Sequence, residues 1–216
     1  RAEARGPLRA VSGRLLILGA GGHARAVADL AVECGWTVAG FTERPGATGP
    51  AVVGDDADLP RLLASGGFDG AIVGVGNTAL ERRAELFRSL KEAGAAVPTL
   101  VHPRAAVSRS CRIGEGSVVF PGVVLGSQVR VGINAVVYSG VVAEHDCAIA
   151  DHAYLSPGVI LCGGVTVQAG AFIGAGAVVV PGVTLEEGTR VRAGAVVSSD
   201  VLAKRSGPRQ PGLPTG

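Results

Sequence analysis

The hexapeptide Ile173-Gly174-Ala175-Gly176-Ala177-Val178 contains the pattern that decides the fold of the second half of this chain. An aliphatic residue is followed four places later by a small one, and this pattern repeats every six residues from about Val101 to Val197. The first position of every repeat is aliphatic, and no residue at the fifth position is larger than valine. A period of six fits neither an α-helix nor an amphipathic strand.

Three such hexads make one coil of a triangular parallel β-helix, in which each hexad supplies a short strand and a corner. Neighbouring strands then stack about 4.8 Å apart along the axis. The aliphatic residue points inward, and the small residue lets the corner close. We therefore expect a β-helix domain over residues 101–200 and a flexible tail over residues 201–216. A β-sandwich is the alternative, but it would not keep one register for so long.

Residues 14–100 predict a Rossmann-like α/β domain, because segments with strand and helix patterns alternate. The expected strands are Arg14–Leu18, Thr37–Phe41 and Gly70–Val75, and the expected helices are Ala24–Cys34, Leu59–Ala64 and Leu80–Ala93. In such a sheet a ligand binds at the carboxyl ends of the strands.

The turn Gly19-Ala20-Gly21-Gly22-His23 joins the first expected strand to the first expected helix. A glycine turn at a helix N-terminus can hold a phosphate. The turn lacks the full G-x-G-x-x-G pattern, because Ala24 and Arg25 occupy the later positions. It therefore favours a nucleotide or nucleotide-sugar over a nicotinamide cofactor.

Composition narrows the classes of partner. The net charge is only +2, which gives no indication of nucleic-acid or anionic-membrane binding. Mean hydropathy is +0.39, yet no stretch approaches the roughly 20 apolar residues of a membrane-spanning helix. No signal peptide is visible, and the four cysteines form no C-x-x-C pair. These observations predict a cytoplasmic protein with reduced thiols and no zinc ribbon.

Three motifs then suggest a family. They are L-G-A-G-G-H-A-R at Leu18 to Arg25, T-L-V-H-P at Thr99 to Pro103, and E-H-D-C-A-I-A-D at Glu144 to Asp151, the last followed by L-S-P-G at Leu155. With these motifs the chain resembles the sugar O- and N-acyltransferases typified by bacterial sialic acid O-acetyltransferase and UDP-4-amino-sugar N-acetyltransferases. The resemblance covers residues 14–200.

The resemblance implies a left-handed β-helix and a homotrimer. It implies transfer of an acetyl group from acetyl-CoA to an amino group (or hydroxyl) of a nucleotide-activated sugar, without a metal, in the biosynthesis of cell-surface glycans. The nucleotide-sugar would bind to the N-terminal domain. Acetyl-CoA would lie in the groove between neighbouring β-helices.

His145 is the candidate general base. It lies two places after the inward Ala143, so its imidazole can face a groove, and an unperturbed imidazole accepts a proton near neutral pH. Glu144 and Asp146 flank it, and either carboxylate can orient the ring. By resemblance Asp146 is the partner.

Other family roles fall on this chain position by position. Contact with the donor thioester, which the family gives to a histidine, falls on Tyr154, with His152 as a rival. Backbone contacts with acetyl-CoA fall on Gly163, Ala175 and Ala193. The nucleotide-sugar is expected at Gly21, Gly22, His23, Glu43, Arg44, Gly76 and Asn77. The family often has an Asp pair where this chain has Glu43-Arg44, which leaves the base and sugar open.

Two other functions are compatible with the sequence. A zinc hydratase of the carbonic-anhydrase type also uses a left-handed β-helix, but it needs three histidines at one metal. The available histidines are His102, His145 and His152, and His102 lies more than two coils from His145. A non-catalytic protein that binds nucleotide-sugars is the other alternative; it would tolerate loss of His145.

Overall fold

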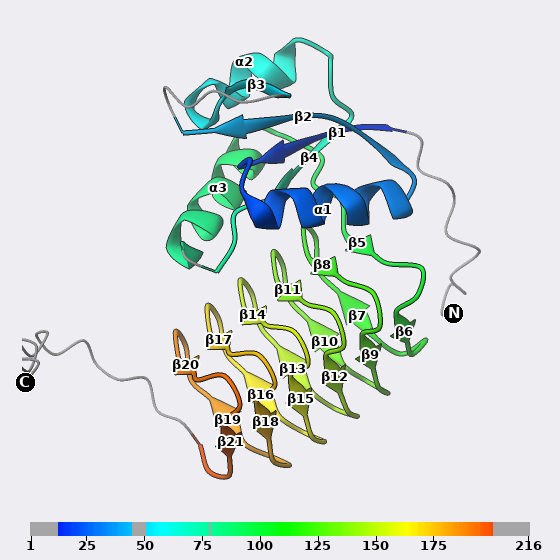
Figure 1. Ribbon diagram of the computed structural model, residues 1–216, viewed down its shortest axis with the longest axis vertical. Helices are drawn as coiled ribbons and strands as arrows, with labels where there is room; N and C mark the ends of the chain where they lie inside the picture. Colours follow the sequence, from blue (N-terminus) through cyan, green and yellow to red (C-terminus); the bar gives the residue numbers. More distant parts are fainter. Residues whose placement is uncertain (1–12, 45–50, 78, 201–216) are drawn as a thin grey trace, which may run out of the picture.

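The computed structural model describes residues 13–44, 51–77 and 79–200 (Figure 1). The tail expected over residues 201–216 lies outside the described residues. A small α/β domain sits at one end of a long stack of coils, and its helix α1 (Gly22–Glu33) lies between the small sheet and the first coils (Figure 1).

The N-terminal domain contains a four-stranded parallel sheet with the order β3-β2-β1-β4. Its strands are β1 (Gly13–Leu18), β2 (Trp36–Glu43), β3 (Val52–Asp55) and β4 (Gly70–Val73). Successive residues of β1 face opposite sides, and Leu15 to Leu18 are all fully buried. Leu15 and Ile17 pack with α1, whereas Leu16 and Leu18 pack with α2 (Leu59–Ala64) and α3 (Leu80–Glu92). Both faces of the sheet are therefore covered, as in other parallel sheets.

The alternating strands and helices expected from the sequence all form, with ends shifted by up to two residues. The expectation missed β3 and the short 3-10 helix η1 (Asp56–Asp58) that follows it. The segment Ala51-Val52-Val53-Gly54 is too short and too weakly patterned to signal a strand. Because this strand and helix were not expected, Asp56, which lies beside the candidate pocket described below, was not considered as a site residue.

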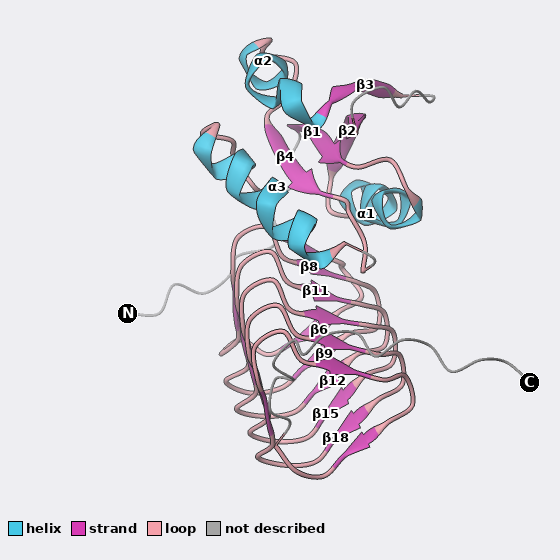
Figure 2. Cartoon of the chain, turned by 90° about the vertical axis from the view of Figure 1, so that its left-hand side faces the viewer, coloured by secondary structure: helices cyan, strands magenta, loops and turns pink. Residues whose placement is uncertain are grey.

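The second half forms a left-handed parallel β-helix, as expected, with three sheets of two-residue strands (Figure 2). Sheet I contains β5 (Leu100–Val101), β8 (Val118–Val119), β11 (Val136–Val137), β14 (Tyr154–Leu155), β17 (Phe172–Ile173) and β20 (Arg190–Val191). Sheet II contains β6 (Ala106–Val107), β9 (Val124–Leu125), β12 (Val142–Ala143), β15 (Ile160–Leu161), β18 (Val178–Val179) and β21 (Val196–Val197). Sheet III contains β7 (Arg112–Ile113), β10 (Arg130–Val131), β13 (Ala148–Ile149), β16 (Thr166–Val167) and β19 (Thr184–Leu185).

The second residue of each strand is the aliphatic residue of the repeat, and it points into the core. From Val119 to Val191 every one of these residues is buried, and those in the end coils pack partly against the same core. The small residues four places later join them. The repeat thus predicted the interior of the β-helix correctly.

From Ile113 to Val191, the third residue after each inward position turns a corner with positive φ, a conformation that costs glycine little. Four corners use another residue, and all four lie in the middle coils: Gln128 (φ 62°), Asn134 (φ 49°), Asp146 (φ 62°) and His152 (φ 59°). Residues other than glycine are strained in this conformation, because their Cβ atom comes close to the backbone. These four corners are therefore less favourable in backbone conformation than the glycine corners.

The outer faces of the sheets differ. On sheet I, Leu100, Val118, Val136 and Tyr154 pack under the N-terminal domain in one buried cluster with α1. On sheet II the outer residues form an aliphatic column, in which Val124, Ile160 and Val196 are 40%, 39% and 69% exposed. Among the described residues no helix is long and apolar enough to cross a membrane.

Candidate functional site

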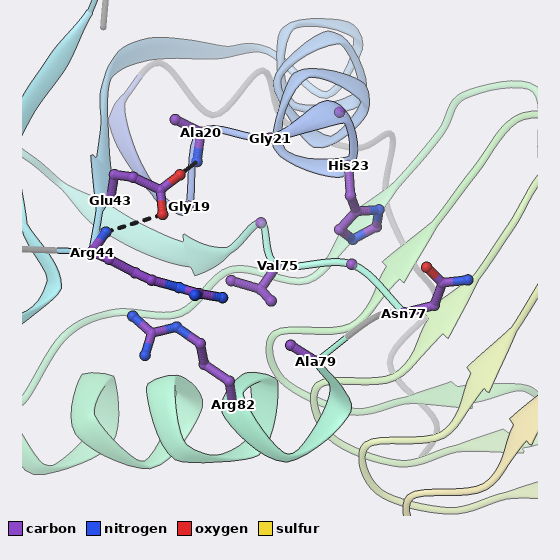
Figure 3. Close-up of a pocket in the computed structure, with 13 residues that line it drawn as sticks. Gly19, Ala20, Gly21, His23, Glu43, Arg44, Val75, Asn77, Ala79 and Arg82 are labelled. Atoms are coloured by element: carbon purple, nitrogen blue, oxygen red, sulfur yellow. Dashed lines mark hydrogen bonds between the residues drawn. The ribbon is translucent and has the colours of Figure 1, made fainter. Parts of the chain in front are cut away.

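A pocket of about 270 Å³ lies at the carboxyl ends of β1, β2 and β4, and Figure 3 shows its lining. All seven residues expected to meet the nucleotide-sugar line this single pocket: Gly21, Gly22, His23, Glu43, Arg44, Gly76 and Asn77. Three segments supply them: the start of α1, the end of β2 and the loop after β4. The fold brings them together because parallel strands end at the same edge of the sheet.

The glycine turn forms one wall of the pocket. Gly21 is the N-cap of α1 and supplies no side-chain cap, so the first N–H groups of the helix face the pocket without a capping side chain. A Cβ atom on Gly21 would meet nothing within 4 Å, which leaves the backbone open to a ligand. Gly19 has φ +100° and approaches Val75 closely. Such an arrangement suits a phosphate group.

Charged side chains form the opposite wall. The Glu43 carboxylate accepts hydrogen bonds from the backbone N–H groups of Ala20 at 3.2 Å and of Arg44 at 3.0 Å. Arg82 of α3 also lines the pocket, and in Figure 3 its side chain extends toward that of Arg44. The sequence reasoning missed Arg82. Its place in the first turn of the helix after a strand end was the available signal.

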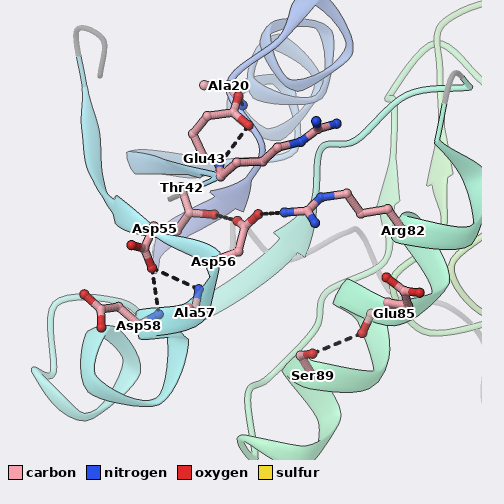
Figure 4. A network of polar contacts seen from close by, with 11 residues as sticks. Ala20, Thr42, Glu43, Asp55, Asp56, Ala57, Asp58, Arg82, Glu85 and Ser89 are labelled. Atoms are coloured by element: carbon pink, nitrogen blue, oxygen red, sulfur yellow. Dashed lines mark hydrogen bonds and ion pairs between the residues drawn. The ribbon is translucent and has the colours of Figure 1, made fainter. Parts of the chain in front are cut away.

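Asp56 holds Arg82 in this position (Figure 4). One carboxylate oxygen pairs with the Arg82 guanidinium, and the other accepts from the hydroxyl of the buried Thr42. The Asp56 side chain is 8% exposed, so the pair is shielded from solvent on the carboxylate side. Arg82 therefore presents its remaining donors to the pocket from a fixed position.

His23 lies between the pocket and the β-helix. Its Nδ1 is 3.0 Å from the hydroxyl of Tyr138, and its ring lies 6.2 Å from that of Phe120. Burial, together with the nearby Arg83 charge, lowers the pKa of His23 to about 3. The ring is thus neutral at physiological pH. It contributes shape to the pocket rather than charge.

His145 and Asp146 occupy the corner between sheets II and III. The two residues hydrogen-bond through Nδ1 and Oδ2 at 2.9 Å, and their side chains are 67% and 65% exposed. A carboxylate can only accept, so the imidazole proton lies on Nδ1 and the lone pair on Nε2 is free. This is the arrangement that a general base needs, and it is paired with Asp146 as expected.

Gly163 lies one coil beyond His145 at the same corner. A Cβ atom there would be 2.6 Å from both Nε2 and Cε1 of His145. The imidazole therefore lies against bare backbone, and only glycine leaves room for it. Gly163 was expected to contact acetyl-CoA; its observed contact is with His145.

Ala175 and Ala193 lie one coil apart at a different corner, between sheets I and II, and both are exposed. Sheet II separates this corner from that of His145 within one chain. The structure therefore divides Gly163, Ala175 and Ala193, three of the four residues expected to contact acetyl-CoA, into two groups along the two edges of sheet II. A single chain does not bring them together.

Tyr154 lies on sheet I, beneath the N-terminal domain, and is 5% exposed. Its ring is 5.9 Å from that of Tyr138 and 6.0 Å from that of His23. Burial raises its pKa. This burial is at odds with the predicted thioester contact, because a donor in a surface groove would reach little of the ring. The rival His152 lies at the corner between sheets III and I and is half-buried beside Phe87.

The three histidines of the zinc alternative lie at three different corners of the β-helix. His102 follows β5, His145 follows β12 and His152 follows β13. Within the described ranges, no three His, Cys, Asp or Glu side chains are grouped so that they could hold a metal ion.

Comparison with known proteins agrees with this architecture. Residues 14–90 match the family model described as the PglD N-terminal domain, and residues 164–199 match that of the bacterial transferase hexapeptide (six repeats). No curated protein sequence matches the chain significantly.

Several solved structures are similar over most of their length. GDP-perosamine N-acetyltransferase from Caulobacter crescentus, solved with CoA and GDP-perosamine, is 39% identical with a TM-score of 0.82, and the match covers 88% of this chain and 90% of that one. A histidine variant of the same enzyme is 37% identical with the same TM-score and coverage. The acetyltransferase domain of PglB from Neisseria gonorrhoeae is 31% identical with a TM-score of 0.80, covering 88% and 93% of the two chains.

This level of identity, across both the α/β domain and the coils, exceeds what a shared fold alone would give. The protein belongs to the family of acetyl-CoA-dependent sugar N- and O-acyltransferases built on a left-handed hexapeptide β-helix.

Proposed function

We propose that this protein transfers the acetyl group of acetyl-CoA to the amino group of a GDP-linked amino sugar, with His145 as the general base. The observation that carries the proposal is the convergence of all seven expected nucleotide-sugar residues on one pocket. The choice of GDP and of an amine follows the Caulobacter relatives, which are 37–39% identical and were solved with GDP-perosamine.

The walls of the pocket suggest how the nucleotide binds. The N-terminus of α1 receives the diphosphate, because its open N–H groups favour an anion. In this arrangement Glu43, at the end of β2, accepts hydrogen bonds from the ribose hydroxyls. The Arg44 guanidinium lines the pocket and makes no hydrogen bond or ion pair with the other described residues. Its two parallel donors are of the kind that recognise O6 and N7 of guanine.

His145 acts on the amine that attacks the thioester. The amine nitrogen forms a bond to the carbonyl carbon while Nε2 of His145 accepts one of its protons. Asp146 stabilises the resulting imidazolium through the 2.9 Å hydrogen bond to Nδ1. The tetrahedral intermediate then expels the CoA thiolate, which takes up the proton from His145. The products are the acetamido sugar nucleotide and free CoA.

The outer face of sheet II supports a homotrimer. Its aliphatic column is the part of the β-helix surface that another copy would cover, and closed cyclic packing buries such faces. Around a threefold axis, the edge that carries His145 in one subunit meets the edge that carries Ala175 and Ala193 in the next. This arrangement would bring base and acetyl-CoA together in a groove between subunits. Sedimentation should then show a trimer, and a stable, active monomer would contradict it.

We place the reaction in the cytoplasm, where acetyl-CoA and nucleotide-sugars are made, as a step toward a cell-surface glycan. The test of the proposed function is a screen of UDP-, GDP- and CMP-amino-sugars with acetyl-CoA, in which free thiol is measured. We expect thiol release with a GDP-amino-sugar. Tight binding of nucleotide-sugars without thiol release from any of them would favour the non-catalytic alternative.

A further inference from the structure

Arg83 of α3 is buried where the N-terminal domain meets the β-helix. It is 1% exposed and is the largest fully buried side chain among the described residues. Desolvation lowers its pKa to about 10, so the guanidinium still carries its charge at neutral pH. Within the described residues no carboxylate pairs with it. A buried cation of this kind is tolerated only when its donors are met by other groups.

Both terminal nitrogens of Arg83 have such partners, and these come from both domains. In the N-terminal domain, Nη1 donates to the carbonyl oxygens of Val75 at 2.7 Å and Val73 at 3.3 Å. In the β-helix, Nη2 donates to Oδ1 of Asn134 at 2.8 Å and to its carbonyl oxygen at 3.3 Å. One guanidinium thus joins the segment after β4, whose Val75 lines the pocket, to a corner of the β-helix.

The same guanidinium determines where the proton of His23 lies. Nη1 of Arg83 is also 3.4 Å from Nε2 of His23, so one of its two hydrogens is shared between this nitrogen and the Val73 carbonyl oxygen. Arginine can only donate, so Nε2 must be the acceptor and the ring proton must lie on Nδ1. Nδ1–H then donates to the Tyr138 hydroxyl at 3.0 Å. The strongly lowered pKa of His23 agrees with this neutral form.

In the β-helix, Asn134 connects Arg83 to His152 through hydrogen bonds. Oδ1 of Asn134 faces Arg83, so the amide nitrogen must face the opposite way. That nitrogen donates to the Arg83 carbonyl oxygen at 3.2 Å and to Nδ1 of His152 at 2.9 Å. Nδ1 of His152 is therefore the acceptor, and the neutral ring carries its proton on Nε2. The two histidines hold opposite tautomers.

Two residues of this network have a strained backbone conformation. Asn134 and His152 have φ of 49° and 59° at equivalent corners of consecutive coils, whereas Gly116 and Gly170 fill the same corner one coil before and one coil after. Strained positions that persist are commonly associated with function.

We infer that Arg83 is a positioning residue that sets the tautomers of His23 and His152 and fixes the wall of the nucleotide-sugar pocket relative to the β-helix. The kinetic part of this inference rests on the proposed nucleotide-sugar site; the tautomers do not. Because Arg83 holds Val75 and His23, its loss should disturb binding of the nucleotide-sugar and leave the acetyl-CoA corners unchanged.

The first test is ¹⁵N NMR of the histidine rings in the full-length protein. The chain has four histidines, so His→Gln variants assign the signals. We expect His23 protonated at Nδ1 and His152 at Nε2. Asn134→Gly should turn the His152 signals into a mixture of tautomers and leave His23 unchanged. Gln128→Gly is the matched control, because it makes the same exchange at an exposed corner with φ 62°. His23 protonated at Nε2, or His152 indifferent to Asn134→Gly, would overturn the inference.

The second test is kinetic and uses Arg83→Lys, which keeps the positive charge but loses the two terminal nitrogens that bond to the two domains. We expect the KM for the nucleotide-sugar to rise about tenfold, roughly the effect of one lost hydrogen bond to a charged group, with the KM for acetyl-CoA within about twofold. Should Arg83→Lys not fold, Asn134→Gly replaces it, with a smaller rise in the same KM. An unchanged KM for the nucleotide-sugar, or an equal rise in both KM values, would overturn the pocket role. A wild-type protein that acetylates no nucleotide-sugar would refute the proposed function, and the NMR result alone would then decide the inference.

Discussion

The imidazole of His145 lies directly against the backbone of Gly163, one coil further along the β-helix, so that a methyl group on Gly163 would be 2.6 Å from Nε2. The group that we propose to accept the proton therefore has its position defined from two sides. Asp146 holds Nδ1 at 2.9 Å, and Gly163 leaves the space that the ring occupies.

Gly163→Ala should leave the fold intact and lower kcat by roughly 10² or more, because the displaced ring no longer acts as a general base. The methyl group would meet the end of an exposed side chain rather than packed backbone. Circular dichroism and steady-state kinetics check this. Gly67→Ala is the control, since its new Cβ makes only an ordinary contact with Ser65. Equal turnover in the two variants would mean that the ring position is unimportant.

Asp56→Asn should raise the KM for the nucleotide-sugar by about three- to tenfold, since Arg82 loses a shielded, charge-assisted hydrogen bond that fixes it at the pocket. The control is Asp58→Asn, which breaks the exposed pair with Arg61 two residues away. Exposed pairs contribute little, so the control should behave as the wild type. If both variants bind alike, Arg82 needs no support from Asp56.

Acid should destabilise the protein between about pH 6.5 and pH 3. His23 has a pKa of about 3 in the fold and about 6.5 when unfolded, so the unfolded state binds the extra proton over this range. Stability is therefore fully present above about pH 6.5 and is lost as the pH falls, by up to about 1.4 kcal/mol per pH unit. Burial lowers the pKa of His152 as well, which adds in the same direction.

Urea unfolding at several pH values measures this dependence. His23→Gln should flatten the slope. A His23→Gln variant with the full wild-type slope would show that His23 is not the group responsible.

Tyr154→Phe should lower the free energy of unfolding by about 1 kcal/mol, the net value of the one hydrogen bond between its hydroxyl and that of Tyr138, and leave the KM for acetyl-CoA unchanged. The reason is the burial of Tyr154 against Tyr138 and His23 at the domain interface. Thermal unfolding and kinetics with varied acetyl-CoA separate the two effects. A raised KM for acetyl-CoA at unchanged stability would restore the thioester contact expected from the family.

The sequence predicted most of the fold from local pattern, whereas the members of the pocket came from the resemblance to the family. The six-residue period determines which residues point inward, and strand ends in a parallel sheet place Gly21, Glu43 and Gly76 at one edge. The relation between the domains was not predictable in this way. Tyr154 occupies an outward position of its hexad, and only the packing of α1 on sheet I shows that the position is buried.

Arg83 was missed for a similar reason. Within Leu80 to Ala93 it is one charged residue among several, and helical spacing alone does not distinguish a buried arginine from an exposed one. Its partners Asn134 and His152 lie far along the chain. No local pattern connects them, since the contact exists only once the two domains have packed.

The role of His145 as general base in acetyl transfer is tested most directly by one assay. The wild-type protein and His145→Asn are each incubated with acetyl-CoA and GDP-perosamine. Free thiol and the mass of the sugar nucleotide are followed together. We predict that the wild type releases one CoA for each acetylated amine, and that His145→Asn, correctly folded, does so about 10² times more slowly or less. Equal rates in the two proteins, or thiol release without an acetylated sugar, would contradict the account.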